Sequence, residues 1–534
     1  IRDSSRTLFS VDGRTVKGMT LLVNGVPWSD PYNDDPLARF LTLSRVRRVE
    51  VIYSASPALT GRAASGGVIN IVIEEGGRKP PFAAGDFTWG ANGRKSRKAW
   101  FSSPDAFING TIAYDEYMQD YFESVAGNPG ALTGLYNSRS VLLDLTMRGK
   151  AADRVLVRLR RFEDSYEGTR NWPELRDPLQ PPEDVRYSGF DSEIRYVRGG
   201  AEVSVRQRFV EMKRKAGQTS GLVLGGAATW QGMAGPADVK GFVSAERAEF
   251  ENELWGVRFA PDADRAEGGL TLGGMAGQLR WRGGLSAGTM TGSGFFAGGE
   301  AAVSHGDEKG LYQTLMAARR VRTPTVEELY QPALERLPDG DMLSTSGDPD
   351  LGHETSDEIS LGLGYGTAVR ADIFARFERS RIEIEGSDPA VYASDGSDDV
   401  IGLRASLDGG GATGVALFDY RWQLSGHWFA DRAEITPGVP EYYVLGGLWL
   451  TRPSFRKTET LTIGVRASET GSRFFPGVEL GSYTLIDLSV SLTVMGVVVK
   501  FEMKNILDEK YETVPGMYMP GQHYRFGINW RLFN

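Results

Sequence analysis

The stretch "YTLIDLSVSLTV" at residues 483–494 decides the fold class, because from its fourth residue onward apolar and polar side chains alternate at every position. Neighbouring side chains of a β-strand point to opposite faces, so this segment is a strand with one apolar and one polar surface. The same pattern recurs in "RVLVRLRRF" (154–162) and "AEVSVRQRF" (201–209). Sustained helical periodicity is hard to find along the chain. The sequence therefore predicts an all-β protein.

Two β architectures fit such strands. A soluble sandwich turns the apolar face inward, whereas a membrane barrel turns it outward to lipid and keeps a polar lumen. The alternating segments run to roughly ten residues or more, beyond the usual mode of about 5–6 for globular sheets. A strand needs about 9–11 tilted residues to cross a bilayer. Segment length thus favours the membrane barrel over a set of soluble β domains.

The connections between these segments fall into two classes. Short ones such as "RGKAADR" (148–154) alternate with long polar stretches. The long stretches cover 119–136, 163–191, 331–350 and 385–399. Short turns at one end and long loops at the other are typical of an outer-membrane barrel. About 450 residues, at about 20 per strand and connection, predict about 22 strands, a size whose lumen has to be plugged.

The composition excludes several classes of function. The 534 residues carry a formal charge of -9, which argues against nucleic-acid binding. There is no cysteine, so disulfides, thiolate metal sites and cysteine catalysis are excluded. The histidines are scattered singly, and no nucleophile elbow accompanies them. We therefore expect no enzyme activity, no cofactor and no metal site. Asp348 and Asp350 in "GDPD" suggest either calcium or an Asx-type turn, and the turn is the commoner use of such a run.

Four further stretches carry a family resemblance. They are "MTLLVNGVPWSDP" (19–31), "RVRRVEVIYSASPALTGRAASGGVINIVIEEG" (45–76), "RRVRTPTVEELYQ" (319–331) with "GDPDLGHETSDEISLGLGY" (347–365), and "VKFEMKNILDEKYETVPGMYMPGQHYRFGINWRLF" (499–533). In this order they resemble the two plug signatures, the barrel motif and the closing hairpin of the TonB-dependent outer-membrane receptors. The resemblance implies a large antiparallel transmembrane β-barrel at 81–534, with a small, partial α/β plug domain at 1–80 inside it.

The N-terminal "IRDSSRTLF" (1–9) resembles an element from the middle of such a plug. By that resemblance, the front half of the plug and the motif that engages the energy-transducing TonB complex would precede Ile1 and are absent from this chain. The plug signatures also imply structural roles for a set of small residues and one amide. That set is Gly25, Gly61, Gly66, Gly67 and Asn70. The apolar run 68–73 is expected to form a strand buried on both faces, with Asn70 bonded to neighbouring backbone.

The resemblance places ligand recognition on the outward apices of the plug, at 12–18 and 30–35, and on the long loops. Basic side chains there suit an anionic ligand, and aromatic rings suit stacking. The candidate ligand-binding residues are Arg14, Lys17, Trp28, Tyr32 and Asn33. For each of them the alternative is a solvated surface residue.

The last strand resembles the sorting signal that the barrel-assembly machinery reads. The residues that match this signal are Arg525, Gly527, Trp530 and Leu532. The same strand also reads as a plain amphipathic edge that closes the barrel by pairing with the first barrel strand.

The resemblance implies a receptor in the outer membrane of a Gram-negative-type bacterium that imports a scarce ligand, such as an iron chelate or a cobalamin-like nutrient. Its expected partners are outer-membrane lipid and lipopolysaccharide, the barrel-assembly machinery, the inner-membrane TonB complex and the small-molecule ligand. The alternative is a receptor-derived barrel that serves as a structural or docking part of an envelope complex and is no longer energised. A soluble multi-domain β adhesin is a weaker third interpretation.

Overall fold

The structure is a computed structural model of the whole chain. It describes residues 20–32, 46–52, 67–73, 82–91, 94–104, 108–125, 128–148, 153–166, 185–214, 217–254, 256–307, 309–331, 346–385, 391–412, 418–430, 438–453, 459–475, 478–513, 519 and 521–532. Two bodies of sheet account for almost all of these residues: a small N-terminal sheet and a closed barrel.

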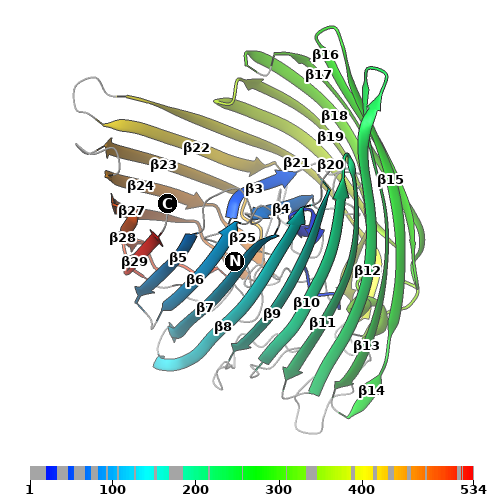
Figure 1. Cartoon of the computed structure of the whole chain (residues 1–534), viewed down its shortest axis with the longest axis horizontal. Coiled ribbons are helices and arrows are strands. Elements are labelled where there is room, and N and C mark those ends of the chain that lie inside the picture. Colours follow the sequence, from blue (N-terminus) through cyan, green and yellow to red (C-terminus); the bar gives the residue numbers. More distant parts are fainter. Residues whose placement is uncertain are drawn as a thin grey trace.

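The small sheet has four strands, β1 (Thr20–Val23), β2 (Val26–Pro27), β3 (Val46–Ile52) and β4 (Val68–Ile73). They lie in the order β2-β1-β4-β3, with β1 parallel to β4 and the other pairs antiparallel. The central strand β4 carries the predicted apolar run, and four of its six side chains are buried. In Figure 1, β3 and β4 lie within the outline of the barrel. The sheet is therefore a plug, held against the inner wall by the contacts described below.

The barrel is one continuous antiparallel meander that closes on itself. Its strands are β5 (Phe82–Gly90), β6 (Lys95–Pro104), β7 (Ile108–Val125), β8 (Asn128–Arg148), β9 (Arg154–Tyr166), β10 (Val185–Arg198), β11 (Ala201–Arg214), β12 (Gly217–Ala234), β13 (Ala237–Leu254), β14 (Val257–Phe259), β15 (Asp262–Ala276), β16 (Leu279–Met290), β17 (Gly294–Gly306), β18 (Leu311–Arg322), β19 (Glu354–Tyr365), β20 (Val369–Glu385), β21 (Val391–Ala412), β22 (Asp419–Phe429), β23 (Tyr442–Pro453), β24 (Thr460–Thr470), β27 (Tyr483–Val494), β28 (Val497–Lys504) and β29 (His523–Leu532).

Within the described residues the barrel wall is 22 strands around, as the sequence predicts, with β14 and β15 counted as one strand. The short β14 and the long β15 both pair with β13, one after the other, and so act as a single strand interrupted near Pro261. Closure is made by β29 against β5, with Gly527 opposite Thr88 and Trp530 opposite Gly85. The predicted pairing of the last strand with the first barrel strand is confirmed.

The two ends of the barrel differ in the length of their connections. At one end, the loop end, β9 is joined to β10 through 167–184 and β18 to β19 through 323–353. At the other, the turn end, β10 is joined to β11 through 199–200 and β12 to β13 through 235–236. The expected asymmetry between long loops and short turns is therefore present.

Two of the predicted long loops are mostly strand. Much of 119–136 belongs to β7 and β8, which pair in register as far as Glu123, and 391–399 belongs to β21. Local polarity and glycine content predicted loops at both places. Cross-strand hydrogen bonding to the neighbour satisfies the backbone there and extends the ladders.

Side chains alternate between lumen and outer surface, and the plug identifies which face is which. On β11, Arg206 and Arg208 donate hydrogen bonds to plug carbonyls, so their face is the lumen. The alternate residues Val203, Val205 and Phe209 face outward, and Val205 is 64% exposed. An outer surface this apolar suits lipid. The register of every strand pair carries the same alternation around the barrel, which places Leu492 and Val494 outside and Asp487 inside.

Two small elements decorate the loop end. The helix α2 (Val326–Tyr330) follows β18, and the hairpin of β25 (Arg473–Phe475) and β26 (Val478–Leu480) lies between β24 and β27. In the part of the chain that the structure describes, no helix has the length and apolar character needed to cross a membrane. The predicted domain boundary between residues 80 and 81 lies in 74–81, outside the described residues.

Candidate functional site

Trp28 fastens the plug to the barrel wall. Its ring is only 3% exposed and lies under two guanidinium groups, those of Arg160 at 4.4 Å and Arg208 at 4.5 Å from the ring centroid. Phe162 meets it edge-on at 5.9 Å. The sequence proposed this ring for ligand stacking. In this structure its neighbours are the plug core and the wall. The ring is therefore buried and anchors the plug instead of being exposed for stacking.

Backbone carbonyls of the plug complete the anchor. Arg206 donates from Nη1 to the Pro27 carbonyl at 2.7 Å, and Arg208 donates from Nη1 to the Ser29 carbonyl at 2.7 Å. Both arginines also bond through Nε to the Asp191 carboxylate, at 3.1 and 2.8 Å. One buried carboxylate thus orients a buried cation, Arg208, and a partly buried one, Arg206, and both donate to plug carbonyls as well. Charge-assisted hydrogen bonds of this kind are the strong ones, because the site is shielded from water.

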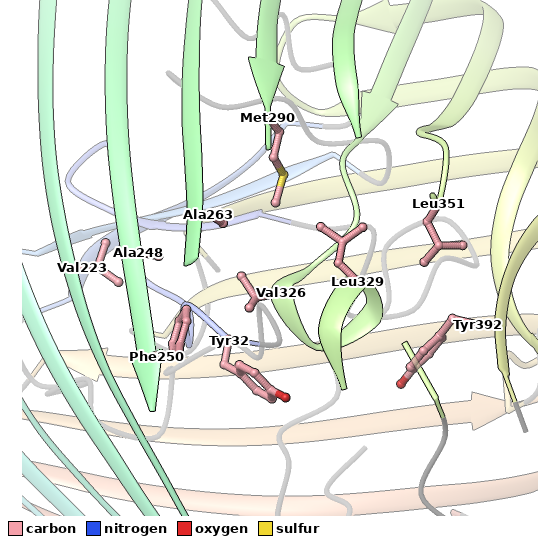
Figure 2. Close-up of a cluster of buried hydrophobic side chains, with 10 residues drawn as sticks. All are labelled: Tyr32, Val223, Ala248, Phe250, Ala263, Met290, Val326, Leu329, Leu351 and Tyr392. Atoms are coloured by element: carbon pink, nitrogen blue, oxygen red, sulfur yellow. The ribbon is translucent and has the colours of Figure 1, made fainter. Parts of the chain in front are cut away.

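Tyr32 is the second point of contact between plug and wall. It is 4% exposed, and its ring meets that of Phe250 edge-on at 5.4 Å. Figure 2 shows it beside Phe250 and close to Val326 of α2. The Tyr32 carbonyl accepts a hydrogen bond from the backbone N–H of Glu327 at 2.9 Å. The plug apex is therefore bonded directly to the loop that connects β18 and β19.

The helix α2 is short, and its own side chains hold it in place. Thr325 and Glu328 form a capping box: the Thr325 hydroxyl accepts from the Glu328 N–H at 3.2 Å, and the Glu328 carboxylate accepts from the Thr325 N–H at 2.8 Å. The buried Arg322 bridges Glu328 and Glu354, with N–O distances of 2.8 and 2.6 Å. This network ties α2 to the ends of β18 and β19. The barrel motif at 319–331 thus forms the part of the wall that contacts the plug apex.

Gly25 lies in the turn between β1 and β2, and Gly67 directly precedes β4. Gly25 (φ 82°) and Gly67 (φ 93°) have backbone angles in the left-handed region, which residues with a Cβ rarely adopt. Asn70 accepts from the Gly25 N–H at 3.0 Å and donates to Glu50 at 2.7 Å. Hydrogen bonds from Arg48 and then Asn70 hold the pKa of the Glu50 carboxyl below its ordinary value. Asn70 therefore joins β4 to β3 and to the turn between β1 and β2.

A basic group of side chains lines the lumen at the loop end, where β28, β29, β5 and β6 meet. We call it the mouth cluster; its members are Arg94, Lys500, Lys504, His523 and Arg525. Arg94 is bonded through its carbonyl to the Gly90 N–H at 3.0 Å, and Gly90 lies opposite Arg525 in the ladder. The charges of Arg94 and Arg525 repel one another.

Carboxylates balance only part of this charge. Lys500 pairs with Glu502 at 2.8 Å and Lys504 with Asp487 at 2.9 Å. Glu502 also attracts Arg525, and the Arg94 guanidinium lies over the Tyr117 ring at 5.3 Å, but neither contact gives the Nε atoms an acceptor. Within the described part of the chain, the Nε atoms of Arg94 and Arg525 are buried and have no hydrogen-bond acceptor. A buried donor without an acceptor costs about 1–3 kcal/mol, so the pair is suited to an anion that supplies one. Guanidinium groups match carboxylate and phosphate oxygens in geometry as well as in charge.

The rim around this cluster is braced by its own loops. Arg473 of β25 donates to the Thr513 carbonyl at 3.1 Å and lies over the ring of Tyr483 at 5.0 Å. The rings of Tyr483 and Tyr511 are 4.3 Å apart. Burial, and then the neighbouring Tyr483, raise the pKa of the Tyr511 hydroxyl to about 12. These contacts join β25 and the start of β27 to the described part of the connection between β28 and β29.

Two other predicted features of the loops are placed by the structure. The Asp350 N–H donates to the Asp348 carboxylate at 2.9 Å, so the Asx-type turn is confirmed. His353 lies between the Ser293 hydroxyl and the Phe295 carbonyl, each 3.0 Å from a ring nitrogen. Burial, and then the charge of Arg265, lower the pKa of His353 below 6.5. It is a structural histidine of the loop that carries α2.

The closing strand contains the residues of the proposed assembly signal. Gly527 faces the lumen beside Thr88, and Trp530 faces outward, where its ring stacks on Phe87 at 5.5 Å. Arg525 faces the lumen as part of the mouth cluster, and Leu532 is the last residue of β29. Recognition of these residues by the assembly machinery stays a prediction.

Five of the residues predicted from the sequence lie outside the described residues: Arg14, Lys17, Asn33, Gly61 and Gly66. Among the described residues, no group of three or more His, Cys, Asp or Glu side chains is arranged to hold a metal ion. Sequence reasoning missed Arg94 as a site residue. The alternation of "HYRFGINW" (523–530) predicts that Arg525 faces the lumen. Arg94 lies in a connection between strands, where no alternation of apolar and polar residues predicts the direction of its side chain.

Comparison with known proteins agrees with this architecture. Residues 2–68 match the family model described as TonB-dependent Receptor Plug Domain. The siderophore receptor PirA from Acinetobacter baumannii has a similar structure, with a TM-score of 0.78 and 12% identity over 98% of this chain and 92% of that one. No curated protein matches the chain.

Two further solved structures are similar across nearly the whole chain. The ferric enterobactin receptor PfeA from Pseudomonas aeruginosa has a TM-score of 0.77 and 12% identity, over 98% of this chain and 93% of that one. The copper transporter OprC has a TM-score of 0.77 and 14% identity, over 98% and 92%. At these identities the likenesses concern the fold. The chain therefore has the fold of a plugged β-barrel like that of these structures, and its residues 2–68 match the plug domain of TonB-dependent receptors.

Proposed function

We propose that this protein is an outer-membrane receptor that binds a scarce anionic ligand, an iron chelate in the first instance, and imports it with energy supplied by the TonB complex of the inner membrane. The observation that carries the proposal is the mouth cluster, where two arginines with unused buried donors face the lumen at the loop end. A cation-lined mouth raises the local concentration of an anion and slows its escape.

We propose that a ligand bound at the mouth is then passed to the plug. The Tyr32 carbonyl of the plug accepts a hydrogen bond from the loop that carries α2. We propose that Arg14, Lys17 and Asn33 contribute contacts from the plug apices and that Trp28 contributes by holding the apex in place. We propose that a ligand that displaces Tyr32 or α2 also displaces the plug apex, because the Glu327 N–H bonds the Tyr32 carbonyl and Tyr32 packs in one hydrophobic cluster with Val326 and Leu329.

The test is ligand binding by the purified full chain. We expect ferric enterobactin, an anionic ferric catecholate, to quench tryptophan fluorescence, and a neutral ferric hydroxamate to bind more weakly. The pair Arg94→Gln and Arg525→Gln should weaken binding of the anionic probe by about tenfold or more, since each tenfold step is about 1.4 kcal/mol. Arg94→Gln alone is the second variant, because Arg525 also lies in the closing strand.

A matched control removes two arginines from the outer face instead. Arg247→Gln with Arg319→Gln deletes the same charge and should leave chelate binding unchanged. Equal weakening by both pairs, or equal affinity for the neutral and anionic probes, would contradict the anion proposal. Binding without TonB-driven uptake in cells would instead support the alternative, a docking component that is no longer energised. If the ligand is cobalamin-like, a neutral corrinoid should bind, and the two arginine substitutions should not change its affinity.

A further inference from the structure

Two neighbouring sectors of the barrel's outer face differ in the size of their side chains. From β6 to β10 the outward side chains form what we call the bulky sector, which presents Phe101, Ile112, Val141, Phe190 and Ile194, each between 42% and 57% exposed. From β12 to β17 runs a belt in which small residues of neighbouring strands lie opposite one another. This small-residue belt consists of Gly226, Ala245, Ala266, Gly268, Ala287 and Ala297. It faces outward, because Gly226 lies opposite Val205 in the ladder.

The small-residue belt leaves a hollow in the outer surface. Its lining includes Leu224, Ala245, Ala266 and Thr289. Arg247 and Asp264 lie opposite one another at its edge toward the loop end. Arg247 is already shared by Glu249 and Asp262, with N–O distances of 2.8 and 3.9 Å. Three carboxylates thus surround one arginine, so this edge of the hollow is acidic.

The edge of the bulky sector toward the loop end is basic. Arg97 and Arg139 share Glu116, with N–O distances of 3.6 and 3.3 Å. The side chain of Glu116 is 11% exposed, whereas those of Arg97 and Arg139 are 58% and 53% exposed, so the guanidinium groups extend beyond the carboxylate. The further charged members of this edge are Arg161, Arg186 and Glu163. Four arginines thus share two glutamates.

We propose that the bulky sector of one copy of this chain docks on the small-residue belt of a second copy, with the arginines of the first over the acidic edge of the second. The two sectors complement one another in charge, which steers association and fixes its register. They also complement one another in shape, because small residues let a neighbouring surface approach closely, and close packing drives association where lipid removes the hydrophobic effect. Arginine stems can lie along apolar surface while their charged ends reach the carboxylates.

The charges also decide which sectors meet. Two copies joined through the same sector would bring carboxylates against carboxylates or guanidinium groups against guanidinium groups, and like charges in contact are costly. The contact is therefore heterologous, and each pair of copies keeps one free sector of each kind for further copies. The inference rests on the outward face being the membrane face in the proposed function, but not on the ligand that the lumen takes.

Crosslinking between two single-cysteine variants tests the contact, because the unmodified chain has no cysteine. Full chains carrying Arg161→Cys and Ala266→Cys are mixed in phosphatidylcholine vesicles, where no glycolipid can join them, and treated with a short bismaleimide. The mixture should give a crosslinked dimer, and either variant alone should not. A control mixture replaces Ala266→Cys by Leu448→Cys, which lies on the outer face of β23, outside both sectors. As much dimer in the control mixture, or from one variant alone, would overturn the proposal.

Charge reversal tests the complementarity without depending on the fold of one variant. The first variant is Arg97→Glu, Arg139→Glu and Arg161→Glu, and the second is Glu249→Lys, Asp262→Lys and Asp264→Lys. Each alone should lose self-association in sedimentation, and their mixture should regain it, because the reversed sectors again carry opposite charges. Regained association also shows that both variants are folded. Association of either variant alone at the unmodified level, or none in a mixture whose members both bind chelate, would overturn the proposal.

A matched variant separates the two sectors from charge in general. Arg319→Glu, Arg379→Glu and Arg452→Glu reverse three arginines outside both sectors and should leave self-association unchanged. An equal loss in this variant would assign the effect to net charge and overturn the proposal. Both sector variants should bind ferric enterobactin as the unmodified chain does, so failure of this inference is distinct from failure of the proposed import function.

Discussion

At the scale of single residues, Trp28 was predicted to be a ligand-binding residue but is buried in the contact between the plug and the barrel wall. Trp28→Ala removes a ring that contacts two buried guanidinium groups, and it leaves a cavity as well. We expect a loss of about 3–5 kcal/mol in plug attachment, the range for deleting a buried large aromatic side chain. Protease cleavage within 46–73 should then become faster. Trp422→Ala, which removes a tryptophan from the lipid-facing surface, is the control and should leave cleavage unchanged.

His353 gives the loop that carries α2 a pH dependence. Its pKa is lowered in the folded protein, so the unfolded state binds more protons as the pH falls below 6.5. The stabilisation is therefore complete above the unfolded pKa and is lost as the pH falls toward the folded one. Hydrogen exchange of 291–296 should be faster at pH 5 than at pH 7.5, after correction for intrinsic rates. His353→Gln should abolish that difference, and a persisting difference would assign it to another group.

At the scale of elements, α2 connects the wall to the plug through backbone geometry. Thr325→Ala removes one half of the capping box and should destabilise the helix by about 0.5–2 kcal/mol. Because the Glu327 N–H is the donor to the Tyr32 carbonyl, the plug contact should loosen with the helix. Hydrogen–deuterium exchange of peptides covering 326–331 should rise accordingly.

Two substitutions bracket this expectation. Thr325→Ser keeps the hydroxyl oxygen and should restore most of the protection. Thr314→Ala removes a hydroxyl of the β17–β18 pair, where Thr314 bonds Ser304 at 2.9 Å, and should leave 326–331 unaffected. Unchanged exchange in Thr325→Ala would mean that Arg322 and the two glutamates hold α2 without the cap.

At the scale of the whole molecule, the plug strands all precede the barrel strands in the chain and lie against the inner wall of the barrel. A barrel of 22 strands is wide enough to leave an open channel when nothing fills it. Deleting residues 1–80 should therefore raise single-channel conductance in planar bilayers by about tenfold or more over the full chain. Equal conductance with and without the segment would show that it does not block the lumen.

Folding of the deletion variant can be checked through closure. The chain has no cysteine, so Thr88→Cys with Gly527→Cys introduces one defined pair. A Cβ placed at Gly527 lies 3.4 Å from the Thr88 hydroxyl, which is close enough for an intrachain disulfide. The deletion variant should form this crosslink as readily as the full chain. Crosslinks only between chains would indicate that the barrel had not closed.

Much of the architecture follows from local pattern. The alternation in 483–494 and 201–209 already separates a lipid face from a lumenal face, because side-chain direction in a strand depends only on the parity of the residue number. The apolar run at 68–73 likewise predicts a central buried strand, and the last strand predicts its own pairing with the first. Loop boundaries at 119–136 and 391–399 did not follow, because whether a polar segment extends a strand depends on the neighbour that pairs with it.

The sites are another matter, because they join residues that are far apart in the chain. By itself the sequence determined the period, the number of strands, the plug and the closing strand. Only the tertiary structure decided that Trp28 meets Arg160 and Arg208, that Tyr32 meets α2, and that Arg94 lies beside Arg525. The physical reason is register. In a closed sheet, each side chain's neighbours are set by hydrogen bonding to the adjacent strands and by what fills the lumen, and neither is written in the order of residues along one strand.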